Sequence, residues 1–114
     1  MTSLRKMLDA GKPLLGLSVM YPSPGAVERI GPDWDWMWID GQHGQMGYEQ
    51  TFELVRACDL VQRPAVVRVP GHDFGMIGKS LDMGAAAVIA VCARNVSNAK
   101  RIGSDGGGDI RAKV

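Results

Sequence analysis

The sequence has few cysteines, no excess of charge of one sign and no long hydrophobic run, and each of these absences excludes a class of protein. It contains two cysteines in 114 residues, which excludes the dense disulfide framework of small secreted domains and leaves no metal-ligand cysteine spacing. We expect both, Cys58 and Cys92, to be reduced and buried as small hydrophobic residues. Positive and negative charges are nearly balanced, since the sequence has 13 Lys and Arg and 12 Asp and Glu. The basic residues are scattered, so the sequence predicts no nucleic-acid partner and no anionic membrane surface.

Long hydrophobic runs are absent as well. The longest strongly apolar stretch, Met83 to Ala93, is well short of the roughly 20 residues that cross a bilayer, and its Gly and Ala content is typical of a buried strand. Near the N-terminus, Arg5, Lys6 and Asp9 interrupt the apolar core that a secretory signal would need. We therefore expect a cytoplasmic protein without a membrane span.

The composition is nevertheless that of a protein with a core. Hydrophobic residues make up 46% and charged residues 22% of the chain, and the length suits one domain. The pattern changes after Ile102, where residues 103–109 include four glycines and no aliphatic or aromatic residue. We expect residues 1–102 to form one domain and residues 103–114 to be a glycine-rich disordered tail.

Strand-like and helical segments alternate through the first 102 residues. Apolar residues recur at helical spacing from Tyr48 to Leu60, whereas the β-branched run from Ala65 to Val69 lies between prolines. The predicted strands are 14–19, 34–39, 65–69 and 86–91, and the predicted helices are 4–8 after Ser3, 25–30, 48–60, a helix between Asp73 and Gly84, and 96–102. This alternation indicates an α/β fold with parallel strands and right-handed crossovers.

The loop after the second predicted strand carries polar side chains that can do chemistry. Parallel sheets bind ligands beyond the carboxyl ends of their strands, which is where Asp40 and His43 lie. An Asp three residues before a His can accept an N–H from one ring nitrogen, fix the tautomer and leave the other nitrogen as a base. The alternative is a loop-capping Asp beside an exposed His, with Gly41 and Gly44 allowing a tight turn.

Arg68 lies inside the apolar third strand, where an unpaired guanidinium would cost several kcal/mol. It can hold a substrate carboxylate with a bidentate fork and stabilise an enolate oxygen. Alternatively, it forms an ion pair with Asp40, with Asp82 or with the end of a helix, and the two roles can coexist. Asp82 itself lies in the segment that ends the helix before the fourth strand, opposite the expected site, where a helix-end turn accounts for it.

Trp34, Trp36 and Trp38 alternate along the second predicted strand. This spacing places all three on one face of the sheet. Such an aromatic face more often belongs to a core or an interface than to a cofactor site.

Four segments, in this order and spacing, resemble the HpcH/HpaI aldolase family, 2-oxo-acid aldolases that include 2-dehydro-3-deoxyglucarate aldolase and 4-hydroxy-2-oxoheptanedioate aldolase. The segments are Gly16-Leu17-Ser18, Trp38-Ile39-Asp40-Gly41-Gln42-His43, Pro64-Ala65-Val66-Val67-Arg68-Val69-Pro70 and Leu81-Asp82-Met83-Gly84-Ala85. The resemblance covers about residues 10–102. It implies parallel β/α units that form the first four strands of a TIM-type (β/α)8 barrel, a truncated N-terminal half.

The resemblance implies a metal-dependent class II aldolase, a carbon–carbon lyase that cleaves or forms 4-hydroxy-2-oxo acids through a pyruvate-type enolate. Its substrates would be a 2-oxo acid such as pyruvate and an aldehyde. Mg²⁺ or Mn²⁺ would be the cofactor, and its ligands lie on later strands of the family, so we expect none in this chain. His43 would act on the base side, Asp40 would orient His43, and Arg68 would hold the oxo-acid oxygens. Gln42, where many members carry glutamate, and Asp82, which matches a family aspartate, would be supporting residues.

A four-stranded piece of a barrel exposes two sheet edges and an unfilled interior, so we expect a homo-oligomer or another form of self-association. Two other functions stay open. One is a non-catalytic half-barrel that serves as an assembly module, and the other is a citrate-lyase-like enzyme acting on acyl-CoA esters. The retained Asp40, His43 and Arg68 favour an enzyme, whereas the missing metal ligands favour loss of activity in the isolated chain.

Overall fold

The computed structural model describes residues 1–71 and 73–90, and it has the α/β architecture that the sequence predicts. The elements are α1 (Leu4–Asp9), β1 (Gly16–Val19), α2 (Pro24–Ile30), the 3-10 helix η1 (Gly31–Asp33), β2 (Trp36–Asp40), α3 (Tyr48–Leu60), β3 (Ala65–Val69), α4 (Phe74–Asp82) and β4 (Ala87–Ala90). All four predicted strands and the first four predicted helices are confirmed. Cys92, the predicted helix 96–102 and the predicted tail 103–114 lie outside the described residues.

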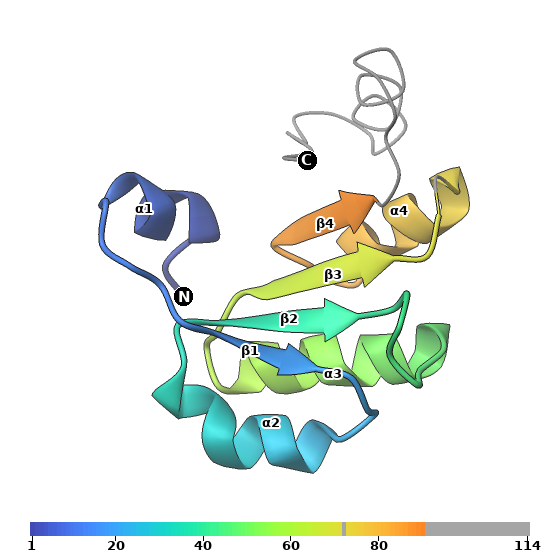
Figure 1. The fold of residues 1–114 in the computed structure, drawn as a ribbon, viewed down its shortest axis with the longest axis horizontal. Helices are drawn as coiled ribbons and strands as arrows, with labels where there is room; N and C mark the ends of the chain where they lie inside the picture. The colour runs from blue at the N-terminus through green and yellow to red at the C-terminus, as the bar shows by residue number, and fades with distance from the viewer. Residues whose placement is uncertain (72, 91–114) are drawn as a thin grey trace.

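The four strands form one parallel sheet in the order β1-β2-β3-β4. In its register Trp38 lies beside Ser18 on one side and Val66 on the other, and Asp40 lies beside Arg68. Helices α2, α3 and α4 lie along one side of the sheet, and α1 stands apart from them near the amino ends of the strands (Figure 1). Because all strands run the same way, their carboxyl ends meet at one edge, where ligands of parallel sheets bind.

The hydrophobic core lies between the sheet and helices α2 to α4. Met37 and Ile39 of β2 point into it and are fully buried, as are Leu54 and Cys58 of α3. Cys58 carries a free thiol, as predicted, and burial raises the pKa of that thiol to about 12. The helix side of the sheet is therefore a dry, close-packed layer.

Alternate residues of the strands face the other side of the sheet, which we call the Trp face and define by Ser18, Trp36, Trp38, Val66 and Ile89. Trp36 and Trp38 are half-buried there and share one face, as their spacing predicts. Trp34 differs from the prediction, because β2 begins only at Trp36. Instead, Trp34 follows η1 and packs against the core.

Local signals in the sequence fix the ends of two helices. The Ser3 hydroxyl accepts a hydrogen bond from the backbone N–H of Lys6 at the start of α1. The Asp73 carboxylate accepts one from Met76, at 2.8 Å, at the start of α4. Gly84, just after α4, has a φ of +107°, a conformation that favours glycine. These three residues act as the caps that the sequence predicts.

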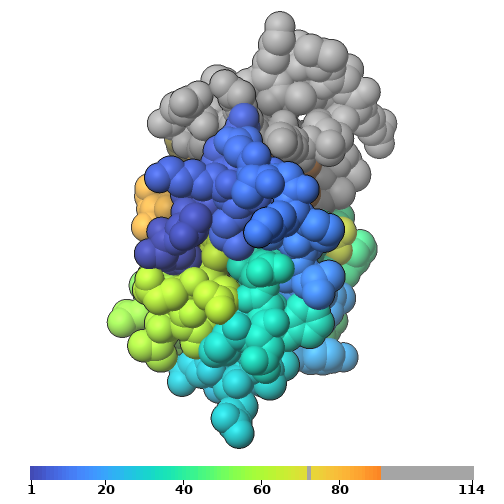
Figure 2. All heavy atoms as spheres, turned by 90° about the vertical axis from the view of Figure 1, so that its left-hand side faces the viewer, coloured from blue at the N-terminus to red at the C-terminus, as the bar shows by residue number. Residues whose placement is uncertain are grey.

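The amino ends of the strands are held together by hydrogen bonds between loops. Arg63, just before β3, donates from Nε to the carbonyl of Trp34 at 2.6 Å and from Nη2 to the carbonyl of Pro32 at 2.8 Å. The backbone N–H of Leu15 donates to the Asp35 carboxylate at 2.8 Å. Figure 2 views this end of the molecule, where the first residues, in blue, lie against the turquoise and yellow-green loops. The opposite, carboxyl edge is left for a functional site.

No helix within residues 1–71 and 73–90 is both long enough and apolar enough to span a bilayer.

Candidate active site

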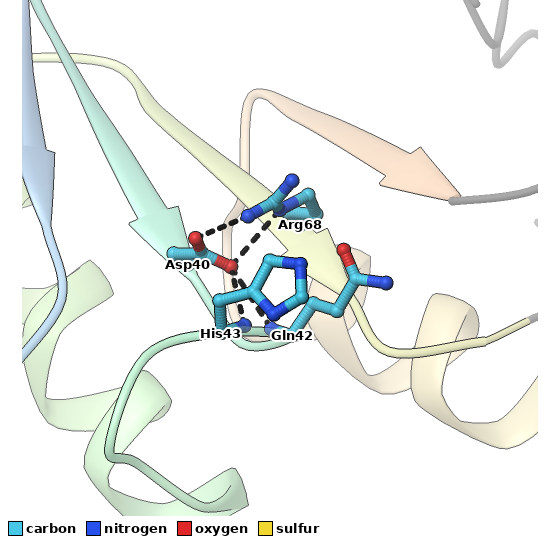
Figure 3. A network of polar contacts seen from close by, with 4 residues as sticks. All are labelled: Asp40, Gln42, His43 and Arg68. Carbon is cyan, nitrogen blue, oxygen red and sulfur yellow. Dashed lines mark hydrogen bonds and ion pairs between the residues drawn. The ribbon is translucent and has the colours of Figure 1, made fainter.

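The candidate site lies at the carboxyl ends of β2 and β3. Asp40 is the last residue of β2, and Arg68 is its register partner on β3. Gln42 and His43 follow in the loop after β2, and their side chains extend from that loop on the side of Arg68 (Figure 3). The sheet thus brings together four of the five site residues that the sequence predicts.

Asp40 and Arg68 form a bidentate ion pair. Arg68 Nε donates to Asp40 Oδ1 at 2.9 Å, and Arg68 Nη2 donates to Asp40 Oδ2. The Asp40 side chain is 3% exposed and the Arg68 side chain 21%, so the pair is largely withdrawn from water. Of the partners that the sequence left open for Arg68, the structure selects Asp40, because parallel pairing places the two side chains next to each other on one face.

Asp40 is also the acceptor for the loop that follows it. The backbone N–H groups of Gln42 and His43 both donate to its Oδ1, each at 3.0 Å. The hydrogen bond from the Arg68 side chain is the largest cause that lowers the pKa of Asp40, and the two backbone donors lower it further. Burial opposes these effects, and the resulting pKa is about 2. The pKa of Arg68 is raised by the same pair, so both groups stay charged at neutral pH.

The sequence left two contacts open for Asp40 and His43, and the structure shows the loop-capping one. Asp40 binds the backbone N–H of His43 and not an N–H of the imidazole ring. Both carboxylate oxygens accept from the Arg68 fork, and Oδ1 also accepts from the two backbone N–H groups of the loop. His43 is exposed. Asp40 therefore orients His43 through the main chain of the loop.

Close backbone contacts fix the course of this loop. Gly41 donates its N–H to the carbonyl of Arg68 at 2.8 Å, and Gly44 donates to the carbonyl of Asp40 at 3.0 Å. Gln45 then donates to the carbonyl of Met20, just beyond β1, at 2.7 Å. A Cβ on Gly44 would collide with the Asp40 carbonyl oxygen, so this position requires glycine. The loop is thereby tied to all of the first three strands.

The side-chain oxygen of Gln42 accepts no hydrogen bond from the described residues. Its Oε1 atom is buried, yet no described residue donates to it. A buried polar atom without a partner is costly, so such an atom at a site edge often accepts from a ligand. This observation supports the place of Gln42 among the supporting residues.

Trp38 is a site neighbour whose role sequence reasoning missed. The guanidinium carbon of Arg68 lies over the Trp38 ring, 5.4 Å from its centroid. The alternation of tryptophans suggested only a core or an interface. The signal was nevertheless present, because Trp38 precedes Asp40 by two residues and therefore shares its face of β2.

Asp82 does not join the other site residues. It is the last residue of α4, which runs back from the carboxyl edge to the start of β4. Asp82 is exposed at the amino ends of the strands, where the sequence placed it.

The residues at the site do not fit a divalent metal ion. Both oxygens of Asp40 are engaged by Arg68 and by backbone N–H groups. Within residues 1–71 and 73–90, no three His, Cys, Asp or Glu side chains gather as a metal site requires. The described site therefore offers a cation and a histidine, which suit an anionic organic ligand.

Comparison with known proteins identifies relatives of this sequence and fold. No family model matches the sequence. The 4-hydroxy-2-oxovalerate aldolase of Novosphingobium aromaticivorans is 32% identical over 102 residues, which are 88% of this chain and 39% of that enzyme. A citrate synthase structure has a TM-score of 0.81 at 29% identity, over 88% of this chain and 41% of that protein. An HpcH/HpaI aldolase/citrate lyase family protein of Burkholderia cenocepacia has a TM-score of 0.76 at 27% identity, over 86% of this chain and 39% of that protein.

The chain is related to the HpcH/HpaI aldolases. The resemblance inferred from the sequence is thereby confirmed, and the fold is a four-stranded part of a TIM-type barrel. The chain spans about two fifths of the length of the curated relatives that it matches.

Proposed function

We propose that this chain is the 2-oxo-acid-binding part of an aldolase, a carbon–carbon lyase that acts on 4-hydroxy-2-oxo acids such as those in the names of its relatives. The observation that carries the proposal is the Arg68 fork, held by the buried Asp40 at the carboxyl edge of the sheet, with His43 beside it. An arginine held in this way is a ready site for a carboxylate.

Arg68 has a second donor edge that could serve such a ligand. Asp40 takes the edge formed by Nε and Nη2. A guanidinium carries a second edge, formed by Nη1 and the other N–H of Nη2, and no described residue accepts from Nη1. The substrate carboxylate or the oxygen of its enolate would bind there, and the positive charge of Arg68 would offset the charge that develops during cleavage.

His43 would move the proton in this proposal. The ring removes the proton from the 4-hydroxyl group, directly or through a water, and the bond between C3 and C4 breaks. The aldehyde leaves, the electron pair forms the enolate between C2 and C3, and protonation at C3 gives the 2-oxo acid. Where a water relays this proton to His43, Gln42 Oε1, which lacks a donor among the described residues, would accept the other O–H of that water and orient it.

The expected metal cofactor comes from the family resemblance. The family resemblance implies Mg²⁺ or Mn²⁺, whose ligands lie on later strands of the family, and we propose that none of them belongs to this chain. The steps assigned to Arg68, His43 and Gln42 do not depend on where its ligands lie.

Two measurements test the proposal, one of binding and one of turnover. Saturation-transfer NMR on the methyl signal of pyruvate should detect binding, and Arg68→Lys should weaken it because a point charge replaces the planar fork. Pyruvate release from 4-hydroxy-2-oxo acids, with Mn²⁺ or with EDTA, should fall roughly 10²- to 10⁴-fold in His43→Ala, while pyruvate still binds. Absence of pyruvate binding to the unmodified chain, or unchanged binding and turnover in both variants, would refute these roles.

A second candidate is a non-catalytic half-barrel that binds a partner or a second copy. It is favoured by the lack of a metal-ligand group within the described residues and by the Trp face, which helices α2 to α4 leave uncovered (Figure 1). Pyruvate binding without turnover under any metal would favour this candidate. A citrate-lyase-like activity, suggested by the name of one structural relative, would instead require binding of an acyl-CoA ester.

We also propose that the chain self-associates and acts in the cytoplasm. Within the described residues β1 and β4 are the outer strands of the sheet, and unpaired strand edges favour pairing with another chain. The half-buried tryptophans of the Trp face add apolar surface that association would cover.

A further inference from the structure

We infer that Trp38 is a positioning residue for Arg68, whose guanidinium it holds in the orientation that presents the Nη1 edge to a carboxylate. The inference rests on the proposed function in one respect only, the identity of the ligand as a 2-oxo acid. The contact between Trp38 and Arg68 stands on the geometry of the site.

The Trp38 ring supplies the contact that Asp40 cannot. Asp40 binds two nitrogens of the guanidinium in the plane of its fork, which fixes that edge but covers neither face of the plane. The guanidinium carbon lies 5.4 Å from the centroid of the Trp38 ring, within the distance at which cation–π attraction is significant. Because the indole ring is the strongest of the aromatic partners for a cation, it limits tilting of Arg68 about its bonds to Asp40.

Trp38 is in turn held by its neighbours on the Trp face. The ring of Trp36 lies 6.2 Å from that of Trp38, at an interplanar angle of 50°, a tilted arrangement that aromatic pairs favour. Trp36 has room because its register partner is Gly16, where any Cβ would collide with the Trp36 ring. Gly16, Trp36 and Trp38 therefore form a packed row that ends at Arg68.

The first experiment measures the contact without any ligand. In ¹⁵N-resolved NMR spectra, the Nε–H signal of Arg68 should be shifted upfield by the ring current of Trp38. We expect Trp38→Phe to reduce this shift and Trp38→Leu to abolish it. The matched control is Trp36→Leu, which removes an indole from the same strand and face but leaves the ring that lies over Arg68.

The second experiment measures pyruvate affinity in the same variants. Loss of a cation–π contact should weaken binding about 2- to 30-fold in Trp38→Leu, with partial recovery in Trp38→Phe and a smaller effect in Trp36→Leu. If Trp38→Leu does not fold, fluorinated tryptophans at position 38, with Trp34 and Trp36 replaced by Phe, weaken the ring's attraction for cations while nearly keeping its shape. Affinity should then fall as fluorine content rises.

The outcomes separate the inference from the proposed function. An Arg68 signal that does not differ between the unmodified chain and Trp38→Leu would overturn the inference, as would unchanged pyruvate affinity in Trp38→Leu alongside weakened affinity in Arg68→Lys. If the unmodified chain does not bind pyruvate but the Arg68 signal depends on Trp38, the proposed substrate is wrong and the positioning role of Trp38 is retained.

Discussion

Asp40 links the chemistry of the site to the stability of the chain. Its side chain accepts from the Arg68 fork and from two backbone N–H groups of the loop. Asp40 therefore balances the charge of Arg68 inside a strand and also shapes the turn that carries Gln42 and His43. The first task needs a carboxylate, because a neutral side chain cannot balance the charge of Arg68.

Asp40→Asn should lower the free energy of unfolding near pH 7 by about 2 kcal/mol, since the pKa of Asp40 is lowered from 3.8 to about 2. A lowered pKa contributes stability that is fully present above the unfolded-state pKa and is lost as pH falls through the folded-state pKa. The difference between the two proteins should therefore be constant from about pH 7 to pH 5 and close between about pH 4 and pH 2. Urea titrations across this range measure it.

Asp9→Asn is the matched control for that experiment. Asp9 forms an ion pair with Arg5 at 3.1 Å, but both side chains are more than half exposed. Exposed pairs contribute little, so Asp9→Asn should leave the free energy of unfolding near pH 7 almost unchanged. An Asp40→Asn protein that is as stable as the Asp9→Asn protein at neutral pH would contradict the role given to Asp40.

At the scale of elements, the loop between β2 and α3 is positioned by backbone contacts that only glycine allows. Gly44→Ala would place a Cβ against the carbonyl oxygens of Asp40 and Met20, and backbone atoms cannot move away cheaply. We expect a loss of about 1–3 kcal/mol in the free energy of unfolding and weaker pyruvate binding, because His43 and Gln42 would be displaced. Chemical denaturation and the pyruvate NMR signal report the two effects.

Gly78→Ala is the matched control, and we expect it to raise the free energy of unfolding where Gly44→Ala lowers it. Gly78 lies within α4, and a Cβ there would meet no heavy atom within 4 Å. Alanine is the better helix former by about 0.5–1 kcal/mol, so this variant should be more stable and bind pyruvate normally. Equal effects of the two substitutions would show that the close approach at Gly44 is unimportant.

Elements whose signals are local could be predicted closely from the sequence. The predicted bounds of α3 and β3 match the structure, because a helical period and a β-branched run between prolines are each complete within one segment. Predicted strand starts at residues 14 and 34 were two residues early. Near residues 14 and 34 the backbone forms hydrogen bonds to loop residues and not to a neighbouring strand, as the N–H of Leu15 does to Asp35. The apolar character of these residues does not show which partner their backbone groups have.

The site was predictable as a set of residues but not as a set of contacts. Asp40, His43 and Arg68 could be chosen because each is a polar residue at a strand's carboxyl end. Which aspartate pairs with Arg68 depends on the register of β2 and β3, and the sequence does not state a register. Asp40 accepts from the backbone N–H of His43 and not from its ring, and the sequence left both contacts open because it does not state the course of the loop.

At the scale of the whole molecule, the sheet is covered unevenly. Within residues 1–71 and 73–90, helices α2 to α4 bury one face (Figure 1), while the Trp face presents two half-buried tryptophans of β2, between the outer strands β1 and β4. Strands in closed barrels have no free edge, and the barrel interior is filled by side chains. A sheet of four such strands therefore favours association that covers the Trp face.

We expect light scattering coupled to size-exclusion chromatography to give a mass that is a multiple of the chain mass. Ser18→Lys should shift that mass toward the monomer, because Ser18 is exposed on the Trp face beside Trp38 and a charge there resists burial. Ala26→Lys adds the same charge on the exposed side of α2 and should leave the mass unchanged. A monomeric unmodified chain would refute self-association, and an equal shift in both variants would place the contact away from the Trp face.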